Sequence, residues 1–279
     1  MSQATGVSTI PIPEIRENEA PQQIALLYDD MRRCMRLPVV NLVYRHLATM
    51  PGALHWVWGA VRPALLSGEV DDALDLLKRK LPLTEPAPLN PELLAEFNSA
   101  DWLAIRRVLD AYNRGNGLNL IVLTTVHLAL RRPEPVRPRA VFSGEPPTDA
   151  VPPLPPLLKI GDLDAETTSV VRDIARLHGG GPGIVPSIYL HLAHWPRFLV
   201  AVCDRIRPDL QSGTLNRMRE AAIALARDAA ERLLPLVAPT APPSAQDLDR
   251  ITAILDHFTS RVIPEMLPVG LEIEKALPH

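Results

Sequence analysis

The sequence predicts an all-α protein built from two tandem helical repeats. Apolar residues recur at helical spacing through 24–35, 40–48 and 103–111, and alternating strand patterns are nearly absent. The segments 46–68 and 191–213 align without a gap at an offset of 145 and are identical at 11 of 23 positions. A long internal repeat indicates that one supersecondary unit was duplicated and that its copies pack together. We therefore expect a pseudo-dimeric arrangement with a pocket between the copies.

The composition limits the classes of function. Hydrophobic residues make up 47% of the 279 residues, and the net charge is -3, so nothing favours nucleic acid or an anionic membrane as a partner. Cys34 and Cys203 are far apart, which argues against a disulfide framework, a zinc site or a thiol redox motif. The first 15 residues lack a basic region followed by an apolar one, so we expect no signal peptide, and the longest apolar run, 118–130, is too short to cross a bilayer. A cytoplasmic protein with a small-molecule substrate is expected, with a homodimer as a further possibility.

The expected elements follow in order along the chain. Residues 1–13 form an N-terminal arm, and residues 14–131 form the first helical repeat. Within it, acidic residues at 71–75 precede basic residues at 78–80, an order that a helix dipole favours. The second repeat spans 158–279.

The prolines mark the connections. Most of the 30 prolines cluster at 82–91, 133–156 and 235–243, where they would end helices and stiffen the links between them. We interpret residues 132–157 as a Pro-rich linker between the repeats. A docking motif for a partner that binds polyproline is the alternative interpretation of this segment.

Three segments of the chain are similar to a known family. RLPVVNLVYRHLATMPG (36–52), RRVLDAYNRGNGLNLIVLTT (106–125) and ARLHGGGPGIVPSIYLHLAHWP (175–196) resemble successive segments of the DehI family, the group I 2-haloacid dehalogenases, which act on both enantiomers. The segment NLVYRHLATMPGAL also resembles the helix of AhpD and carboxymuconolactone decarboxylase proteins. The C-x-x-C-x-x-x-H centre of the peroxidase members is missing here, which excludes their chemistry.

The resemblance implies a mechanism. In the family, an aspartate activates a water molecule that attacks the halogen-bearing carbon directly, without a covalent ester, and an asparagine holds that water. The asparagine matches Asn116, preceded by Asn113. The family's serine–aspartate pair matches Ser187 and Ile188, and no carboxylate occurs between residues 173 and 204. Because isoleucine cannot accept a proton, the resemblance supports the fold and undermines the activity.

His191 is the candidate substitute base. In a helix over 186–194 it lies on the same face as Ser187 and Ile188, and an imidazole can take up a proton near neutral pH. Ser187 would then orient water or act as a nucleophile. The alternative is that His191 is structural, because His46 occupies the matching place in the first repeat.

Other patterns near this segment give weaker evidence for a function. His178, His191 and His194 could form a metal site, but no acidic or cysteine ligand stands among them, and we expect neither a metal nor a cofactor. HGGGPG is similar to an oxyanion loop, yet no G-x-S-x-G elbow accompanies it. Gly179–Gly183 is better interpreted as a helix end followed by a turn.

The remaining polar and apolar candidates complete the predicted pocket. Asparagine and glycine together commonly break a helix, so we expect Asn116 at a break that faces the interior. Val39 and Leu42 match large aromatic walls of the family, and their smaller side chains predict a roomier pocket. The candidate catalytic residues are Asn116, Ser187 and His191. The candidate substrate-binding residues are Val39, Asn41, Leu42, Tyr44, Asn113, Ile188 and Tyr189.

Three functions follow from these expectations. The first is a divergent enzyme of this family that acts on a small organic substrate between the repeats without the family's aspartate. The second is an active 2-haloacid dehalogenase with a substitute base. The third is a ligand-binding or scaffold protein that kept the fold and lost the chemistry.

Overall fold

A computed structural model describes residues 12–84, 88–132, 144–179, 185–237 and 244–278. The protein is all-α: within these ranges helices and loops alternate and no strand occurs. This confirms the predicted fold class. Most of the proposed N-terminal arm and the first part of the proposed linker lie outside the described residues.

Twelve α-helices are labelled in the described part of the chain. Those before the Pro-rich segment are α1 (Gln22–Met35), α2 (Leu42–Leu47), α3 (Ala53–Leu66), α4 (Glu69–Lys80), α5 (Pro91–Leu94) and α6 (Ser99–Arg131). Those after it are α7 (Ala165–Leu177), α8 (Ser187–Leu192), α9 (Pro196–Ser212), α10 (Thr214–Leu233), α11 (Ala245–His257) and α12 (Ile263–Lys275), with a π-helical turn, Phe258–Val262, between the last two.

The two halves present their helices in the same order. Helices α1–α4 and α7–α10 have matching places in the succession, and α6 is matched by α11 and α12 joined through the π-helical turn. This order is what two copies of one unit would give. That the halves are copies stays a prediction from the sequence.

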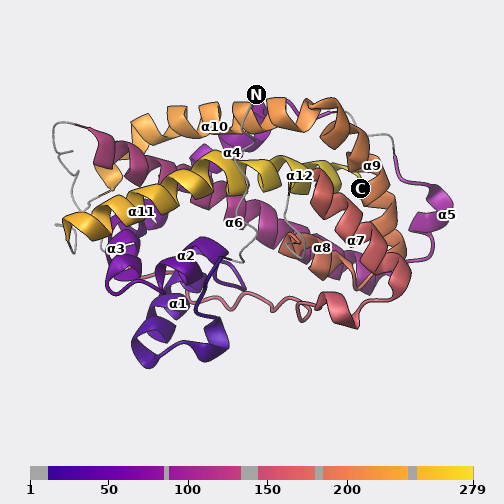
Figure 1. The fold of residues 1–279 in the computed structure, drawn as a ribbon, viewed down its shortest axis with the longest axis horizontal. Helices are drawn as coiled ribbons and strands as arrows, with labels where there is room; N and C mark the ends of the chain where they lie inside the picture. The colour runs from indigo at the N-terminus through magenta and orange to yellow at the C-terminus, as the bar shows by residue number, and fades with distance from the viewer. Residues whose placement is uncertain (1–11, 85–87, 133–143, 180–184, 238–243, 279) are drawn as a thin grey trace, which may run out of the picture.

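Three long helices connect the two ends of the molecule. Helices α6, α10 and α12 run along its long axis, with α1–α3 at one end and α7–α9 at the other (Figure 1). Helix α6 has 33 residues, and at 1.5 Å per residue it is about 50 Å long. It begins at Ser99 because Asn98 and Asp101 form a reciprocal capping box, which satisfies free backbone N–H groups.

The long helices contribute to two hydrophobic clusters. The first joins α1–α4 to the later part of α6, through residues such as Leu118 and Val122. The second joins α7–α9 to the earlier part of α6, through Ile105 and Val108. Helices α10 and α12 likewise supply side chains to both clusters. Each cluster therefore draws on both halves of the chain.

The expected helix break around Asn116 is wrong, because α6 runs through it without interruption. The glycines on either side serve close packing instead. A Cβ atom at Gly115 would lie 2.7 Å from the Asn41 side-chain nitrogen, and one at Gly117 would lie 2.2 Å from a Leu74 methyl carbon. Glycine suits these positions because the side chains of Asn41 and Leu74 lie against the backbone of α6, where a Cβ atom would have to displace them.

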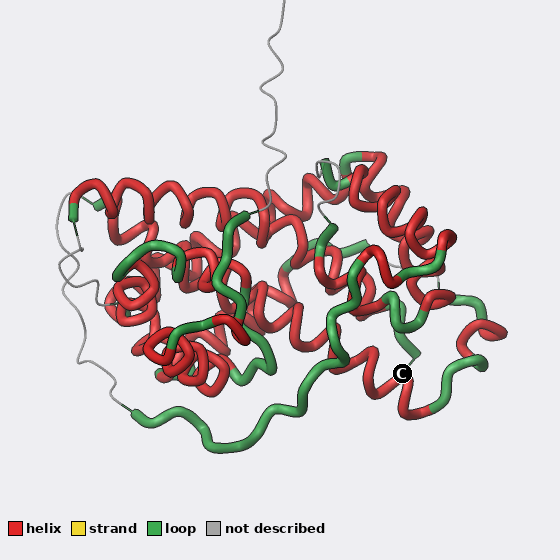
Figure 2. The backbone as a smooth tube through the Cα atoms, turned by 60° about the horizontal axis from the view of Figure 1, so that its bottom comes forward, coloured by secondary structure: helices red, strands yellow, loops and turns green. Residues whose placement is uncertain are grey.

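Histidines hold the extended segments that lead into each half. His46 on α2 hydrogen-bonds the Pro13 carbonyl at 2.7 Å, and His191 on α8 hydrogen-bonds the Pro155 carbonyl at 3.1 Å. His194 also meets the Pro156 carbonyl, at 2.7 Å. Figure 2 shows the loop that contains Pro155 and Pro156 running along one side of the helical body.

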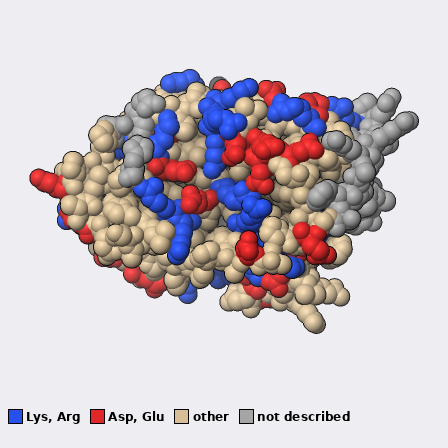
Figure 3. Space-filling view, turned by 180° about the vertical axis from the view of Figure 1, so that it is seen from behind, with Lys and Arg blue, Asp and Glu red and all other residues tan. Residues whose placement is uncertain are grey.

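The distribution of charged and apolar residues in the structure follows the pattern of the sequence. On the face shown in Figure 3, basic and acidic side chains are interspersed, so neither sign dominates this surface. Helix α4 has acidic residues in its first turn and basic residues in its last, as predicted. Among the described helices, none is both long enough and apolar enough to cross a membrane.

Candidate functional site

Helix α8 places the predicted residues Ser187, Ile188 and His191 against α6. Ile188 is buried, with 2% of its surface exposed, and packs in the second hydrophobic cluster. Ser187 hydrogen-bonds the phenol of Tyr112 on α6, and that phenol also meets His191 Nδ1 at 2.8 Å. The three polar groups form one hydrogen-bonded chain that ties α8 to the segment of α6 just before Asn116.

The Pro155 contact decides the tautomer of His191. A carbonyl oxygen only accepts, so Nε2 must carry the ring proton and donate it to Pro155. Nδ1 then accepts from the Tyr112 hydroxyl, and the Tyr112 oxygen is left to accept from Ser187. Burial lowers the pKa of His191 to about 4, so the ring is neutral near pH 7. In this arrangement both ring nitrogens of His191 are engaged.

The two predicted asparagines of α6 have different surroundings. Asn113 is fully buried, and its side-chain nitrogen donates to a carboxylate oxygen of Glu274 on α12 at 2.7 Å. Its oxygen lies against Gly270, where a Cβ atom would be 2.0 Å away. Asn116 is partly exposed and lies one turn beyond Tyr112 on the same face of α6.

Helix α2 supplies the predicted residues of the first half. Asn41 precedes the helix, and its side chain lies on Gly115 of α6. Tyr44 is fully buried and meets the Trp58 ring edge to face, at 5.9 Å between centroids. Asn41 Oδ1 and the Tyr44 hydroxyl are buried and have no hydrogen-bond partner within the described structure. The other predicted wall residues, Val39 and Leu42, are partly buried at the same end.

Tyr189, the remaining predicted residue, belongs to a second polar chain. Its buried hydroxyl lies 2.7 Å from His178 Nε2, and His178 Nδ1 lies 2.8 Å from a carboxylate oxygen of Glu265 on α12. The chain links the end of α7 to α8 and α12. His178, His191 and His194 thus have separate partners, and no group of three or more potential metal ligands occurs in the described part of the chain.

Four polar residues at the site were not predicted from the sequence. They are Tyr112, Asn119, Glu265 and Glu274. Tyr112 stands directly before Asn113 in the segment that resembles the family, which is a signal that could have identified it. Asn119 could have been found as a lone amide within the apolar run 118–130. The two glutamates on α12 are distant from their partners in sequence: Glu274 lies 161 residues after Asn113, and Glu265 lies 87 residues after His178. No local pattern connects either pair.

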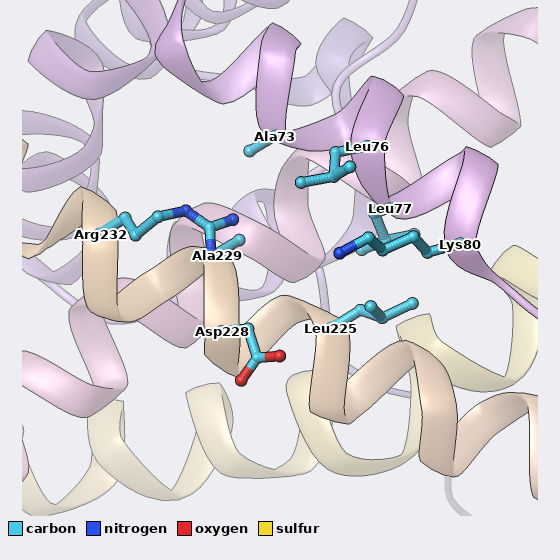
Figure 4. Close-up of a pocket in the computed structure, with 8 residues that line it drawn as sticks. All are labelled: Ala73, Leu76, Leu77, Lys80, Leu225, Asp228, Ala229 and Arg232. Atoms are coloured by element: carbon cyan, nitrogen blue, oxygen red, sulfur yellow. The ribbon is translucent and has the colours of Figure 1, made fainter.

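Two hollows lie away from these residues. One of about 30 Å³ opens between α4 and α10, where Lys80, Arg232 and Asp228 surround an apolar floor (Figure 4). Another of about 530 Å³ lies beside α9. It is lined by Thr84, Pro88, Leu89, Asn90, Leu93, Ala201, Asp204, Arg205, Pro208 and Asp209.

The fold is shared with solved dehalogenase structures. A D-2-haloacid dehalogenase in complex with L-LA superposes with a TM-score of 0.78 at 19% identity, covering 99% of this chain and 100% of that one. A mutant of a D-2-haloacid dehalogenase with D-2-CPA gives the same TM-score at 20% identity, covering 97% and 98% of the two chains. The chain therefore has the all-α fold of these solved structures.

Two relatives narrow the class to a family. A configuration-inverting 2-haloacid dehalogenase of Alcaligenes xylosoxydans xylosoxydans is 30% identical over 206 residues, which cover 70% of this chain and 68% of the relative. Its counterpart in Pseudomonas sp. (strain 113) is 26% identical over 212 residues, covering 70% and 67%. No family model matches the chain. The chain belongs to the family of configuration-inverting 2-haloacid dehalogenases, as its sequence motifs predicted.

Proposed function

We propose that this protein is a divergent hydrolase of the family, acting on a small organic substrate bound where α2, α6 and α8 meet. Ile188 stands where the family places its water-activating aspartate. One observation supports the proposal: the Ser187–Tyr112–His191 contacts hold α8 against α6 one turn before Asn116, as a site shared by Ile188 and Asn116 would require.

The hydroxyl chain offers a path for a proton. A water molecule beside Ser187 can give its proton to Ser187 as Ser187 passes its own to Tyr112 and Tyr112 passes its own to His191 Nδ1. The imidazole is then the final proton acceptor, and the hydroxide is left to attack the substrate. The low pKa of His191 makes this base weak, so a substrate with an activated carbon or carbonyl is required. Asn116, whose side chain is a neutral amide, would orient the attacking water.

An active 2-haloacid dehalogenase with a substitute base is the second candidate, and the Glu274 contact favours it. This carboxylate accepts the hydrogen bond from Asn113 at 2.7 Å and is partly buried, so a general base exists beside one of the two asparagines. A protein that only binds its ligand is the third candidate, favoured by the burial of Ile188 and the engagement of both nitrogens of His191.

The Ile188→Asp variant tests the proposal. We expect the unmodified protein to release no halide from D- or L-2-chloropropionate, because position 188 has no proton acceptor. The variant should release halide from both, since burial raises the pKa of a carboxyl at this position and makes it a better base near neutral pH. Halide is measured against a family dehalogenase as positive control, and folding of the variant is checked by circular dichroism.

Two further variants separate the candidates. If the unmodified protein already releases halide, the primary proposal is wrong and a substitute base must exist. Glu274→Gln should then abolish the release, whereas His191→Gln should leave most of it, which would support Glu274 as that base. Failure of a folded Ile188→Asp variant to release halide would show that the site has diverged at more than this position. The binding-only candidate would then stand.

A further inference from the structure

The first half of the molecule contains buried polar groups that have no hydrogen-bond partner among the described residues. Asn119 on α6 is 1% exposed, and neither its side-chain oxygen nor its nitrogen has a hydrogen-bond partner in the described structure. The buried Asn41 Oδ1 and Tyr44 hydroxyl have none there either. Burying such groups without hydrogen bonds costs about 1–3 kcal/mol each. Four unpaired atoms on three side chains therefore point to a ligand.

These three side chains lie where α2 packs on α6. The Asn41 side chain rests on Gly115, which has no side chain and lets the two elements approach. Asn119 lies one turn beyond Gly115 on the same face of α6, and Tyr44 lies one turn beyond Asn41 on α2. A helical turn is about 5.4 Å long, so Asn119 and Tyr44 each lie about that far along their helices from the Asn41–Gly115 contact.

The second half shows how the same positions are bridged when a partner is present. Tyr189 matches Tyr44 at the offset of 145. Glu265 matches Asn119 at an offset of 146, at which Leu109-Asp110 also matches Leu255-Asp256. There the imidazole of His178 joins the phenol to the carboxylate through contacts of 2.7 and 2.8 Å. His178 caps the end of α7, whereas the residue that caps α1 is Arg36, which is exposed.

The chemistry of the cluster selects a neutral ligand. Asn119 offers an acceptor and a donor side by side, Asn41 offers an acceptor, and Tyr44 offers a hydroxyl. Burial raises the pKa of Tyr44, so the phenol stays neutral. A carboxylate would face two carbonyl oxygens and would be buried without a facing cation among the three residues, which is costly. A primary carboxamide matches the donor and acceptor of Asn119 with two hydrogen bonds.

We propose that Asn119, Tyr44 and Asn41 form a binding site for the carboxamide group of a small neutral molecule of about the size of an imidazole ring. The inference rests on the proposed function in taking this site as part of the substrate pocket. It names the substrate class as small 2-substituted amides, in contrast to the 2-haloacids after which the relatives are named.

Binding of lactamide, compared with L-lactate, tests the inference without requiring turnover. The two molecules have the same carbon skeleton and hydroxyl group and differ in carboxamide against carboxylate. Isothermal titration calorimetry on the full chain should show lactamide binding at least tenfold more tightly than lactate. Weaker or equal binding of lactamide, or no binding by either molecule, would overturn the inference. This experiment does not measure halide release. A failure of the proposed function and a failure of this inference can therefore be told apart.

Asn119→Leu supplies the second readout. Leucine has a similar size and no polar atoms, so the variant should lose at least tenfold in lactamide affinity. The Tm of the unliganded variant should rise, because two unpaired buried groups are removed. Asn216→Leu, at an exposed asparagine on α10, is the matched control and should keep lactamide affinity. An Asn119→Leu variant with a lower Tm and unchanged affinity would show that Asn119 is only structural.

Discussion

At the residue scale, His191 illustrates how tertiary contacts decide a side chain's role. Its place on the helix with Ser187 suggested a base, and a free imidazole near its usual pKa of 6.5 would suit that role. In the folded protein its two nitrogens meet Tyr112 and the Pro155 carbonyl. His46 meets a carbonyl in the same way in the first half. The imidazole thus anchors an extended segment, and any catalytic role of His191 would be exerted through Tyr112.

The pH dependence of the free energy of unfolding reports on the pKa of His191. Burial places the folded-state pKa of His191, about 4, below the unfolded value of 6.5, so the unfolded chain takes up the proton first as the pH falls. The contribution of neutral His191 to the free energy of unfolding is fully present above pH 6.5 and is lost as the pH falls towards 4. Between pH 7 and pH 5 this group should cost the protein about 2 kcal/mol.

His191→Gln isolates that contribution, because glutamine keeps a donor and an acceptor but does not titrate. Urea unfolding at pH 7 and pH 5 should show that the variant loses about 2 kcal/mol less than the unmodified protein over this interval. An equal loss in both proteins would mean that His191 is protonated in the folded state, contrary to its burial.

At the element scale, glycines set the distances between helices. The Asn-Arg-Gly-Asn segment suggested a break, yet α6 continues through it while Gly115 and Gly117 receive Asn41 and Leu74. Gly270 plays the same part on α12, where it receives Asn113. The local sequence favoured a helix break, but packing against Asn41, α4 and α12 keeps α6 continuous.

Gly270→Ala should destabilise the protein by about 1–3 kcal/mol, because the new methyl group would lie 2.0 Å from the buried oxygen of Asn113, whose side-chain nitrogen is held by Glu274. Gly59→Ala is the matched control on α3. This glycine is exposed with nothing within 4 Å of a new Cβ atom, so alanine should stabilise the helix by about 0.5–1 kcal/mol. Chemical unfolding measures both, and a stabilising Gly270→Ala would contradict the packing of α6 on α12.

At the scale of the whole molecule, the halves depend on each other. Helix α6 belongs to the first half of the sequence, yet Ile105 and Val108 pack among side chains of α7–α9. Ala226 and Leu233 of α10 pack in the opposite cluster with α1–α4. Neither half buries its apolar surface alone, so the two predicted repeats do not have separate cores.

A fragment of residues 1–131 should therefore lack a cooperative unfolding transition. It leaves α6 without α10 and α12, and the exposed apolar surface removes the main term that opposes chain entropy. Thermal unfolding followed by near-ultraviolet circular dichroism, with the full chain alongside, checks this. A sharp transition in a monomeric fragment would show that the first half has a sufficient core of its own.

The sequence by itself determined the all-α class and the family, because helical periodicity and motif spacing are local properties of the chain. It also predicted that Asn113, Ser187 and Ile188 line one pocket, which stays a prediction. Only the tertiary structure decided their partners: Tyr112 between Ser187 and His191, Glu274 on Asn113, and the unpaired Asn119. These contacts arise where helices distant in sequence cross, and the hydrogen-bond partners of a buried group depend on that crossing more than on its neighbours along the chain.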